Sequence, residues 1–142
     1  MPTLTERLTT RGWRMTPQRR VISALFDVSA SQHVHLTADD VLEQAVAVLP
    51  DISRATVYNT LGELVDAGEL LAVSVGDRIT RYDPNVHTEH HHLVCTGCGA
   101  IFDVPALPVP PPSPGGEAGG FVVEAAEVIY RGRCARCAGQ DA

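Results

Sequence analysis

Residues 83–103, DPNVHTEHHHLVCTGCGAIFD, contain four of the six histidines and two of the four cysteines in this chain. Cys95 and Cys98 form a CxxC pair within this stretch, and Cys134 and Cys137 form a second pair near the end of the sequence. Four thiolates from two CxxC pairs are the donor set of a closed, tetrahedral zinc site. The two pairs therefore predict a structural Zn(II) site, and the plain alternative is a set of unpaired core thiols.

The composition indicates a folded protein made of one ordinary domain or two small ones. Of its 142 residues, 44% are hydrophobic and 20% are charged, which is typical of a globular chain. A domain well under about 80 residues often needs a metal ion for stability. The sequence has neither an apolar run of membrane-spanning length nor a secretory signal. We therefore predict a cytoplasmic protein with no membrane partner, in which the CxxC pairs bind metal instead of forming disulfides.

Capping residues mark the starts of the helices in the first half of the sequence. A serine or threonine oxygen can accept a hydrogen bond from a free N–H of the first helical turn, and proline fits the first helical position. Apolar residues at helical spacing follow each cap, and a glycine or proline ends the pattern. These rules predict an amphipathic segment from Thr3 to Thr10, a helix after Thr16-Pro17, a helix from a capping box at Thr37–Asp40 to Pro50, and a helix from Ser53 to Gly68.

After the last of these helices the apolar period changes from that of a helix to that of a strand. Residues 70–75 and 79–82 predict two strands around Gly76-Asp77, a turn pair typical of hairpins. Three helices followed by a hairpin is the order of a winged helix-turn-helix, whose third helix enters the DNA major groove. The net charge of −6 opposes DNA binding, but residues 1–20 contain five arginines and one acid. The alternative is that this third helix only packs into the core. Otherwise, the predicted DNA contacts are Arg54, Thr56, Tyr58 and Asn59 on the third helix and Arg14 and Arg19 beside it.

The C-terminal part of the sequence predicts short strands around the first CxxC pair, at residues 91–95 and 100–104, and a β-rich segment at 121–130. Residues 105–120 contain six prolines and four glycines, so no regular element is predicted there. Doubling the length of the loop between the CxxC pairs costs only about 0.6 kcal/mol, against roughly 10–16 kcal/mol for structural zinc binding. We predict two domains. Residues 1–83 form a DNA-binding domain, which includes the wing, and residues 84–142 form a metal-binding domain.

Six segments, GWRMTPQRR, HLTADD, ISRATVYNTLGELVDAGEL, RYD, HHHLVCTGCG and CARC, occur in this order along the chain. Together they resemble the ferric uptake regulator family of metal-responsive repressors over nearly the whole sequence. The resemblance implies an α+β fold, with an N-terminal winged helix-turn-helix and a small C-terminal α/β dimerisation domain. It also implies a homodimeric transcriptional repressor, not an enzyme, that binds double-stranded operator DNA when it is loaded with metal.

Within this family the residues resemble the peroxide-sensing branch, in which three histidines and two aspartates hold a regulatory Fe(II) or Mn(II). Iron-responsive members usually have a glutamate in place of Asp83. By resemblance, hydrogen peroxide oxidises His35 or His90 when the bound metal is iron. The regulatory ligands that the resemblance implies are His35, Asp83, His90, His92 and Asp103.

The geometry of a strand tests two of these ligands independently. Residues two apart on a strand point to the same face, so His90 and His92 share a face that His91 does not. The proline-rich segment lacks the histidine that some relatives use for an additional metal, which predicts two metal ions per subunit. The histidines that we interpret as surface residues or neighbours of the ligands are His33, His87 and His91.

Three other functions are open at the level of the sequence. A regulator of iron or zinc homeostasis from the same family would respond to metal supply without sensing peroxide. A non-haem iron enzyme would hold its metal with two histidines and one carboxylate and leave positions open for substrate. A zinc storage or scaffold protein would need only the cysteines. Five ligands leave little room for a co-substrate, and the capped third helix followed by a wing disfavours a scaffold.

Overall fold

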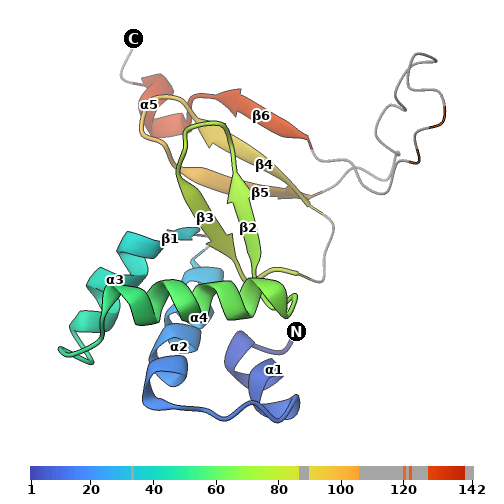
Figure 1. The fold of residues 1–142 in the computed structure, drawn as a ribbon. Coiled ribbons are helices and arrows are strands. Elements are labelled where there is room, and N and C mark those ends of the chain that lie inside the picture. Colours follow the sequence, from blue (N-terminus) through green and yellow to red (C-terminus); the bar gives the residue numbers. More distant parts are fainter. Residues whose placement is uncertain (33, 87–89, 106–119, 121, 123–127, 140–142) are drawn as a thin grey trace. The chain divides into compact units, whose positions relative to one another are not determined.

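The structure is a computed structural model that describes residues 1–32, 34–86, 90–105, 120, 122 and 128–139 (Figure 1). The chain divides into two compact units, an N-terminal unit of residues 1–88 and a C-terminal unit of residues 89–142. The boundary that the sequence predicts, between residues 83 and 84, stays a prediction.

The helices of the N-terminal unit start where the sequence predicts. Each helix is preceded by a serine or threonine whose side-chain oxygen accepts a hydrogen bond from the N–H three residues later, which satisfies one of the free donors of the first turn. The caps are Thr3, Thr16, Thr37 and Ser53, and the helices are α1 (Leu4–Thr10), α2 (Pro17–Ser31), α3 (Ala38–Val46) and α4 (Arg54–Asp66).

Two helix ends differ in how well the sequence predicts them. Gly68 ends α4 as predicted, with a φ of 73°, a left-handed conformation that glycine adopts at little cost. By contrast, α3 ends at Val46, before the predicted stop at Pro50. The N–H groups of Val48 and Leu49 both donate to the carbonyl of Ala45, so a tight turn replaces the last helical turn.

The core of the N-terminal unit lies between the apolar faces of its four helices. Apolar residues three or four positions apart share one face of a helix, and burying each large aliphatic or aromatic side chain contributes about 1.5–3 kcal/mol. The largest buried side chains of this core are Leu4, Leu8, Ile22, Phe26, Val41, Val57, Leu61, Leu64 and Leu70.

A three-stranded antiparallel sheet completes the N-terminal unit. Its strands are β1 (Leu36–Thr37), β2 (Leu71–Ser74) and β3 (Thr80–Asp83), in the order β1-β3-β2. The β2–β3 hairpin is the predicted wing, and Figure 1 shows it following α4. The sequence did not predict β1, because two residues are too few to establish a strand period. Helices α2, α3 and α4, the hairpin and the extra strand confirm the winged helix-turn-helix.

The C-terminal unit contains a second three-stranded sheet, in the order β5-β4-β6. Strand β4 (His90–Cys95) pairs antiparallel with β5 (Ile101–Pro105) and parallel with β6 (Ile129–Gly132), and the short helix α5 (Ala135–Gly139) follows. The strands predicted at 91–95 and 100–104 are confirmed, and α5 was not predicted. Most of the predicted 105–120 loop and most of the β-rich segment 121–130 lie outside the described residues.

Helices and sheets in both units confirm the predicted α+β fold class, with a winged helix followed by a small α/β domain. Across the described part of the chain, every helix is too short or too polar to cross a membrane.

Candidate metal centres and nucleic-acid interface

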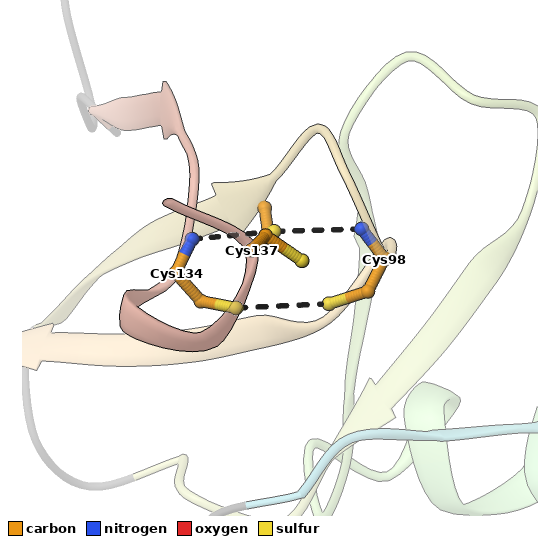
Figure 2. Close-up of side chains that lie close together, drawn as sticks. Cys98, Cys134 and Cys137 are labelled. Carbon is orange, nitrogen blue, oxygen red and sulfur yellow. Dashed lines mark hydrogen bonds between the residues drawn. The ribbon is translucent and has the colours of Figure 1, made fainter. Parts of the chain in front are cut away.

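The four cysteines meet because β4 and β6 run parallel. Their register places Cys95 opposite Gly132, so Cys134 follows at the same end of the two strands as the first CxxC pair. The backbone N–H groups of Cys98 and Cys134 both point to the Cys95 sulfur, at 3.5 and 3.3 Å. The Sγ atoms of Cys98 and Cys134 are 3.9 Å apart, and a dashed line joins them in Figure 2.

The sulfur cluster fits a zinc ion in both spacing and chemistry. All four Sγ atoms lie within 4.8 Å of one another, and none of the cysteines forms a disulfide. Tetrahedral zinc with Zn–S bonds of about 2.3 Å requires sulfurs about 3.8 Å apart. A small inward movement of the side chains therefore suffices for the predicted ligand set.

The electrostatics of this cluster also favour a cation. Hydrogen bonds from the backbone N–H groups of Cys134 and Cys98 lower the pKa of Cys95 to about 5. Hydrogen bonds with the sulfurs of Cys134 and Cys95 favour the protonated thiol of Cys137 and raise its pKa to about 12, and a further thiolate beside these sulfurs would also be repelled. A divalent metal ion would remove this conflict by binding all the sulfurs as thiolates.

Gly97 leaves no room for a side chain beside this cluster. A Cβ added there would lie 3.0 Å from Sγ and 3.1 Å from Cβ of Cys137. We expect Gly97→Ala to weaken zinc binding about tenfold, since overpacking a tight site costs about 1–3 kcal/mol. Competition with a chelator on the full-length protein measures the affinity. The control is Gly132→Ala, where the added Cβ meets nothing within 4 Å; an unchanged affinity in Gly97→Ala would contradict the prediction.

The N-terminal unit brings together His35 and Asp83, two of the predicted regulatory ligands. The antiparallel β1–β3 register pairs Leu36 with Tyr82, which places the residue before Leu36, His35, beside the residue after Tyr82, Asp83. His35 Nε2 lies 3.2 Å from Asp83 Oδ2, and both side chains are buried. The other oxygen of Asp83 accepts a hydrogen bond from the N–H of Asn85, at 2.8 Å. An imidazole and a carboxylate oxygen therefore lie at hydrogen-bonding distance.

The C-terminal unit brings together the other three predicted ligands. His92 pairs with Asp103 across β4 and β5, and His90 lies two residues away on the same face. The Nε2 atoms of His90 and His92 are 3.5 and 3.6 Å from the same oxygen of Asp103. His91 Nδ1 instead accepts a hydrogen bond from the N–H of Val128, so the predicted alternation of the histidines is confirmed.

Nitrogen and carboxylate donors without sulfur suit Fe(II), Mn(II) or Zn(II) more than Cu(I). Both groups of donors have this chemistry. That these residues and the cysteines bind metal stays a prediction, as does the interpretation of His91 as a neighbour of the ligands. His33 and His87 lie outside the described residues.

Helix α4 exposes three of its four predicted DNA contacts. Arg54, Tyr58 and Asn59 are exposed, whereas Thr56 is partly buried and its hydroxyl lies 2.9 Å from that of Ser53. Tyr58 is 49% exposed, which is high for an aromatic side chain and leaves it accessible to a ligand.

Of the three arginines predicted to contact DNA, two form ion pairs within the protein. Arg14 is exposed. The guanidinium of Arg19 lies over the Trp13 ring, at 5.2 Å from its centroid, and pairs with Glu63 at 3.0 Å. Arg54 pairs with Asp39 of α3 at 2.5 Å, and this hydrogen bond raises the pKa of Arg54. DNA contact by all six residues stays a prediction.

The fold also assembles a group of charged residues close to Asp83 in the N-terminal unit. No pattern in the sequence indicates this group. Arg7 Nε and Arg11 Nη1 bind the two oxygens of Glu69, at 2.7 and 2.5 Å. Arg7 also donates to the carbonyl of Pro84, at 3.1 Å. Only the spacing of Arg7 and Arg11, four residues apart, was visible in the sequence.

Comparison with known proteins adds three findings to this geometry. The model of the ferric uptake regulator family matches residues 10–109. The transcriptional regulator FurA of Mycobacterium tuberculosis is 34% identical over 142 residues, which cover 99% of this chain and 94% of that protein. The peroxide-responsive repressor PerR of Staphylococcus aureus is 39% identical over 92 residues, which cover 65% of this chain and 60% of that protein.

A solved structure of a zinc-bound manganese uptake regulator has a similar fold. It superposes with a TM-score of 0.69 at 28% identity, over 93% of this chain and 98% of that one.

Proposed function

The chain belongs to the ferric uptake regulator family, and on that premise we propose that it is a metal-dependent repressor that senses hydrogen peroxide. Proteins of this family are metal-responsive transcriptional regulators and not enzymes. The observation that carries the peroxide proposal is the sulfur-free donor set, in which His90 and His92 converge on Asp103 and His35 contacts Asp83.

The four cysteines would hold a structural Zn(II) in this proposal. Their sulfurs have the spacing and the charge conflict that such an ion resolves, and a structural neighbour is a zinc-bound regulator. The zinc would take no part in sensing, since a closed site with four protein ligands leaves no open position.

The regulatory Fe(II) or Mn(II) would be held by His35, Asp83, His90, His92 and Asp103. The first two residues belong to the N-terminal unit and the other three to the C-terminal unit, so one ion bound by all five would link the units. Repression then requires only that the linked dimer bind operator DNA more tightly than the unlinked one. Couplings of this kind are typically about 1–3 kcal/mol.

Iron, unlike manganese, would supply the electrons that cleave hydrogen peroxide. We propose that the oxidant then attacks an imidazole ring, at His35 or His90. In the net reaction a hydroxyl group from peroxide replaces a ring hydrogen of histidine, and that hydrogen leaves with the other hydroxyl group as water. The ring would return to iron the electrons that cleaved the O–O bond. The oxidised ring is a poorer nitrogen donor, so the ligand set fails and the repressor releases DNA.

Operator binding tests this proposal directly. A duplex selected from a random library by the Zn,Mn-loaded protein serves as the operator. The Zn-loaded protein is then given Fe(II) or Mn(II) under anaerobic conditions, and its binding is measured before and after a stoichiometric pulse of peroxide. We expect binding to be lost only in the iron form and not to return with a thiol reductant. Loss that the reductant reverses would point instead to the cysteines.

Regulation of iron or zinc homeostasis is the second candidate function. It is favoured by the similarity to FurA, which extends over 99% of this chain, whereas that to PerR extends over 65%. A homeostatic regulator would require metal for operator binding and keep its binding after peroxide.

We propose that DNA is bound by Arg54, Thr56, Tyr58 and Asn59 of α4, with Arg14 and Arg19 at the flanking phosphates. In the free protein, Asp39 competes with DNA for Arg54. The pair is largely exposed, at 61% and 74% of the two side chains, and exposed pairs contribute little to stability. Asp39 also places a negative charge close to the expected path of the phosphates.

Asp39→Asn is therefore expected to tighten binding to duplex DNA. We expect the affinity for DNA to rise about threefold to tenfold. The slope of log affinity against log salt concentration should become steeper by the amount expected for about one more phosphate contact. Titration of operator DNA at several salt concentrations measures both quantities. Asp66→Asn, which removes an equal charge at the opposite end of α4, is the control. Weaker operator binding by Asp39→Asn would mean that Asp39 orients Arg54 toward DNA instead of competing for it.

A further inference from the structure

Arg7 connects three separate segments of the N-terminal unit. From α1 its guanidinium donates to the Glu69 carboxylate at 2.7 Å, to the Glu69 carbonyl at 3.0 Å and to the Pro84 carbonyl at 3.1 Å. The side chains of Arg7 and Glu69 are only 11% and 6% exposed. A guanidinium presents several N–H donors in a rigid planar fork, so these contacts fix the segments relative to one another.

Glu69 keeps the Arg7 side chain in place. Burial opposes ionisation of Glu69, but the hydrogen bonds from Arg7 and Arg11 outweigh it and hold the pKa of Glu69 below its ordinary value. Glu69 is therefore ionised at neutral pH, and it binds Arg7 with one oxygen and Arg11 with the other.

The position of Pro84 gives this contact a consequence for the proposed metal site. Strand β3 ends at Asp83, which still pairs with Leu71 of β2. No β-ladder continues beyond that residue in the described part of the N-terminal unit. The Arg7 guanidinium instead binds the carbonyl of Pro84, the first residue after the strand. The peptide group between Pro84 and Asn85 is thus held by a side chain of α1.

The Asp83 carboxylate depends on this peptide for its direction. One oxygen accepts from the N–H of Asn85, which is the residue after Pro84, and the other faces His35 Nε2 at 3.2 Å. If the Pro84 carbonyl were released, the Asn85 N–H would move with it and the carboxylate would lose its orientation. Groups that orient metal ligands typically affect metal affinity by about 10–100-fold.

We propose that Arg7, held by Glu69, is a positioning residue for the regulatory metal site, where it orients Asp83 toward the ion and toward His35. This inference rests on the proposed function, because it takes Asp83 and His35 as ligands of Fe(II) or Mn(II). It adds α1 to the parts of the chain that determine metal affinity.

Arg11 provides a matched control for this proposal. Arg11 is the residue directly after α1, four positions after Arg7, and it also binds a Glu69 oxygen. Its other contact is with the carbonyl of Ala67, at 3.1 Å, which is remote in sequence from Asp83. Arg7→Gln and Arg11→Gln thus remove the same charge and one bond to the same carboxylate. The first also releases the carbonyls of Pro2, Glu69 and Pro84, and the second releases that of Ala67.

The test is a Mn(II) titration of the full-length, Zn-loaded protein, in which electron paramagnetic resonance measures the concentration of the free ion. We expect Arg7→Gln to weaken Mn(II) binding at least tenfold, with Arg11→Gln within about twofold of wild type. Thermal melting and zinc content establish that each variant is folded. If Arg7→Gln does not fold, Arg7→Lys replaces it, because an ammonium keeps the charge but cannot bind Glu69 and Pro84 with the geometry of a fork.

The outcomes separate the two proposals. Wild-type protein that binds no Mn(II) beyond its zinc would overturn the proposed function. Wild-type binding with an unchanged affinity in the Arg7 variants would overturn the positioning role alone. Equal weakening by Arg7→Gln and Arg11→Gln would also overturn it, because general loosening of α1 would then explain the loss.

Discussion

Replacing Cys98 with serine is expected to remove zinc from the protein and to unfold the C-terminal unit. This unit spans residues 89–142, and the buried apolar side chains in its described part are only Val94, Cys95 and Ile101. Burial of each contributes at most about 1.5–3 kcal/mol, whereas structural zinc binding contributes roughly 10–16 kcal/mol. The metal therefore dominates the stability of this unit.

Zinc content after dialysis and thermal melting measure this effect. The helical signal of the N-terminal unit serves as an internal reference, because its helices have their own apolar core. Thr96→Ser, in the same CxxC loop, is the matched control, since it keeps the hydroxyl that donates to the Gly132 carbonyl. A Cys98→Ser protein that retains one zinc ion with wild-type affinity would rule out the four-cysteine site.

Peroxide treatment of the iron-loaded protein is expected to add one oxygen atom to His35 or His90 and to abolish operator binding. Oxidation should be confined to these rings, because an oxidant formed at the bound iron reacts before it diffuses away. Trypsin cuts after arginine, so His35 lies in the peptide of residues 21–54 and His90 in that of residues 82–131. Tandem mass spectrometry of the two peptides locates the oxygen.

Each peptide contains its own control histidine. His33 shares the first peptide with His35, and His91, which binds the Val128 N–H instead of facing Asp103, shares the second with His90. The manganese-loaded protein controls for oxidation that does not need iron. Oxygen spread evenly over all the histidines, or found equally with manganese, would exclude site-directed oxidation.

The elements that the sequence predicts correctly are those with a local cause. Thr16 and Ser53 cap their helices through bonds to N–H groups three residues away, and Gly68 ends α4 through its own backbone conformation. The alternation of His90, His91 and His92 follows from the geometry of one strand. In each case the interacting groups are neighbours in the chain, so their spacing is sufficient.

The elements that the sequence misses have causes elsewhere in the fold. Strand β1 exists because Leu36 and Thr37 pair with β3, more than forty residues later in the chain. The early end of α3 is an exception, because the turn at Ala45 that replaces its last residues is local. The packing of Arg19 against Trp13 and Glu63 was likewise not predicted, and its contact with DNA stays a prediction. None of these partners can be identified from local periodicity.

The sequence by itself determined the fold class, the helix starts and the two chemically distinct sets of donors. Tertiary structure alone decided which groups meet: Cys134 and Cys95 through the parallel register of β4 and β6, Arg54 with Asp39, and Arg7 with Glu69 and Pro84, 62 and 77 residues away. The physical reason is that caps, turns and strand alternation depend on neighbouring residues. Contacts over such separations depend on how whole helices and strands pack around the apolar core, which no short pattern encodes.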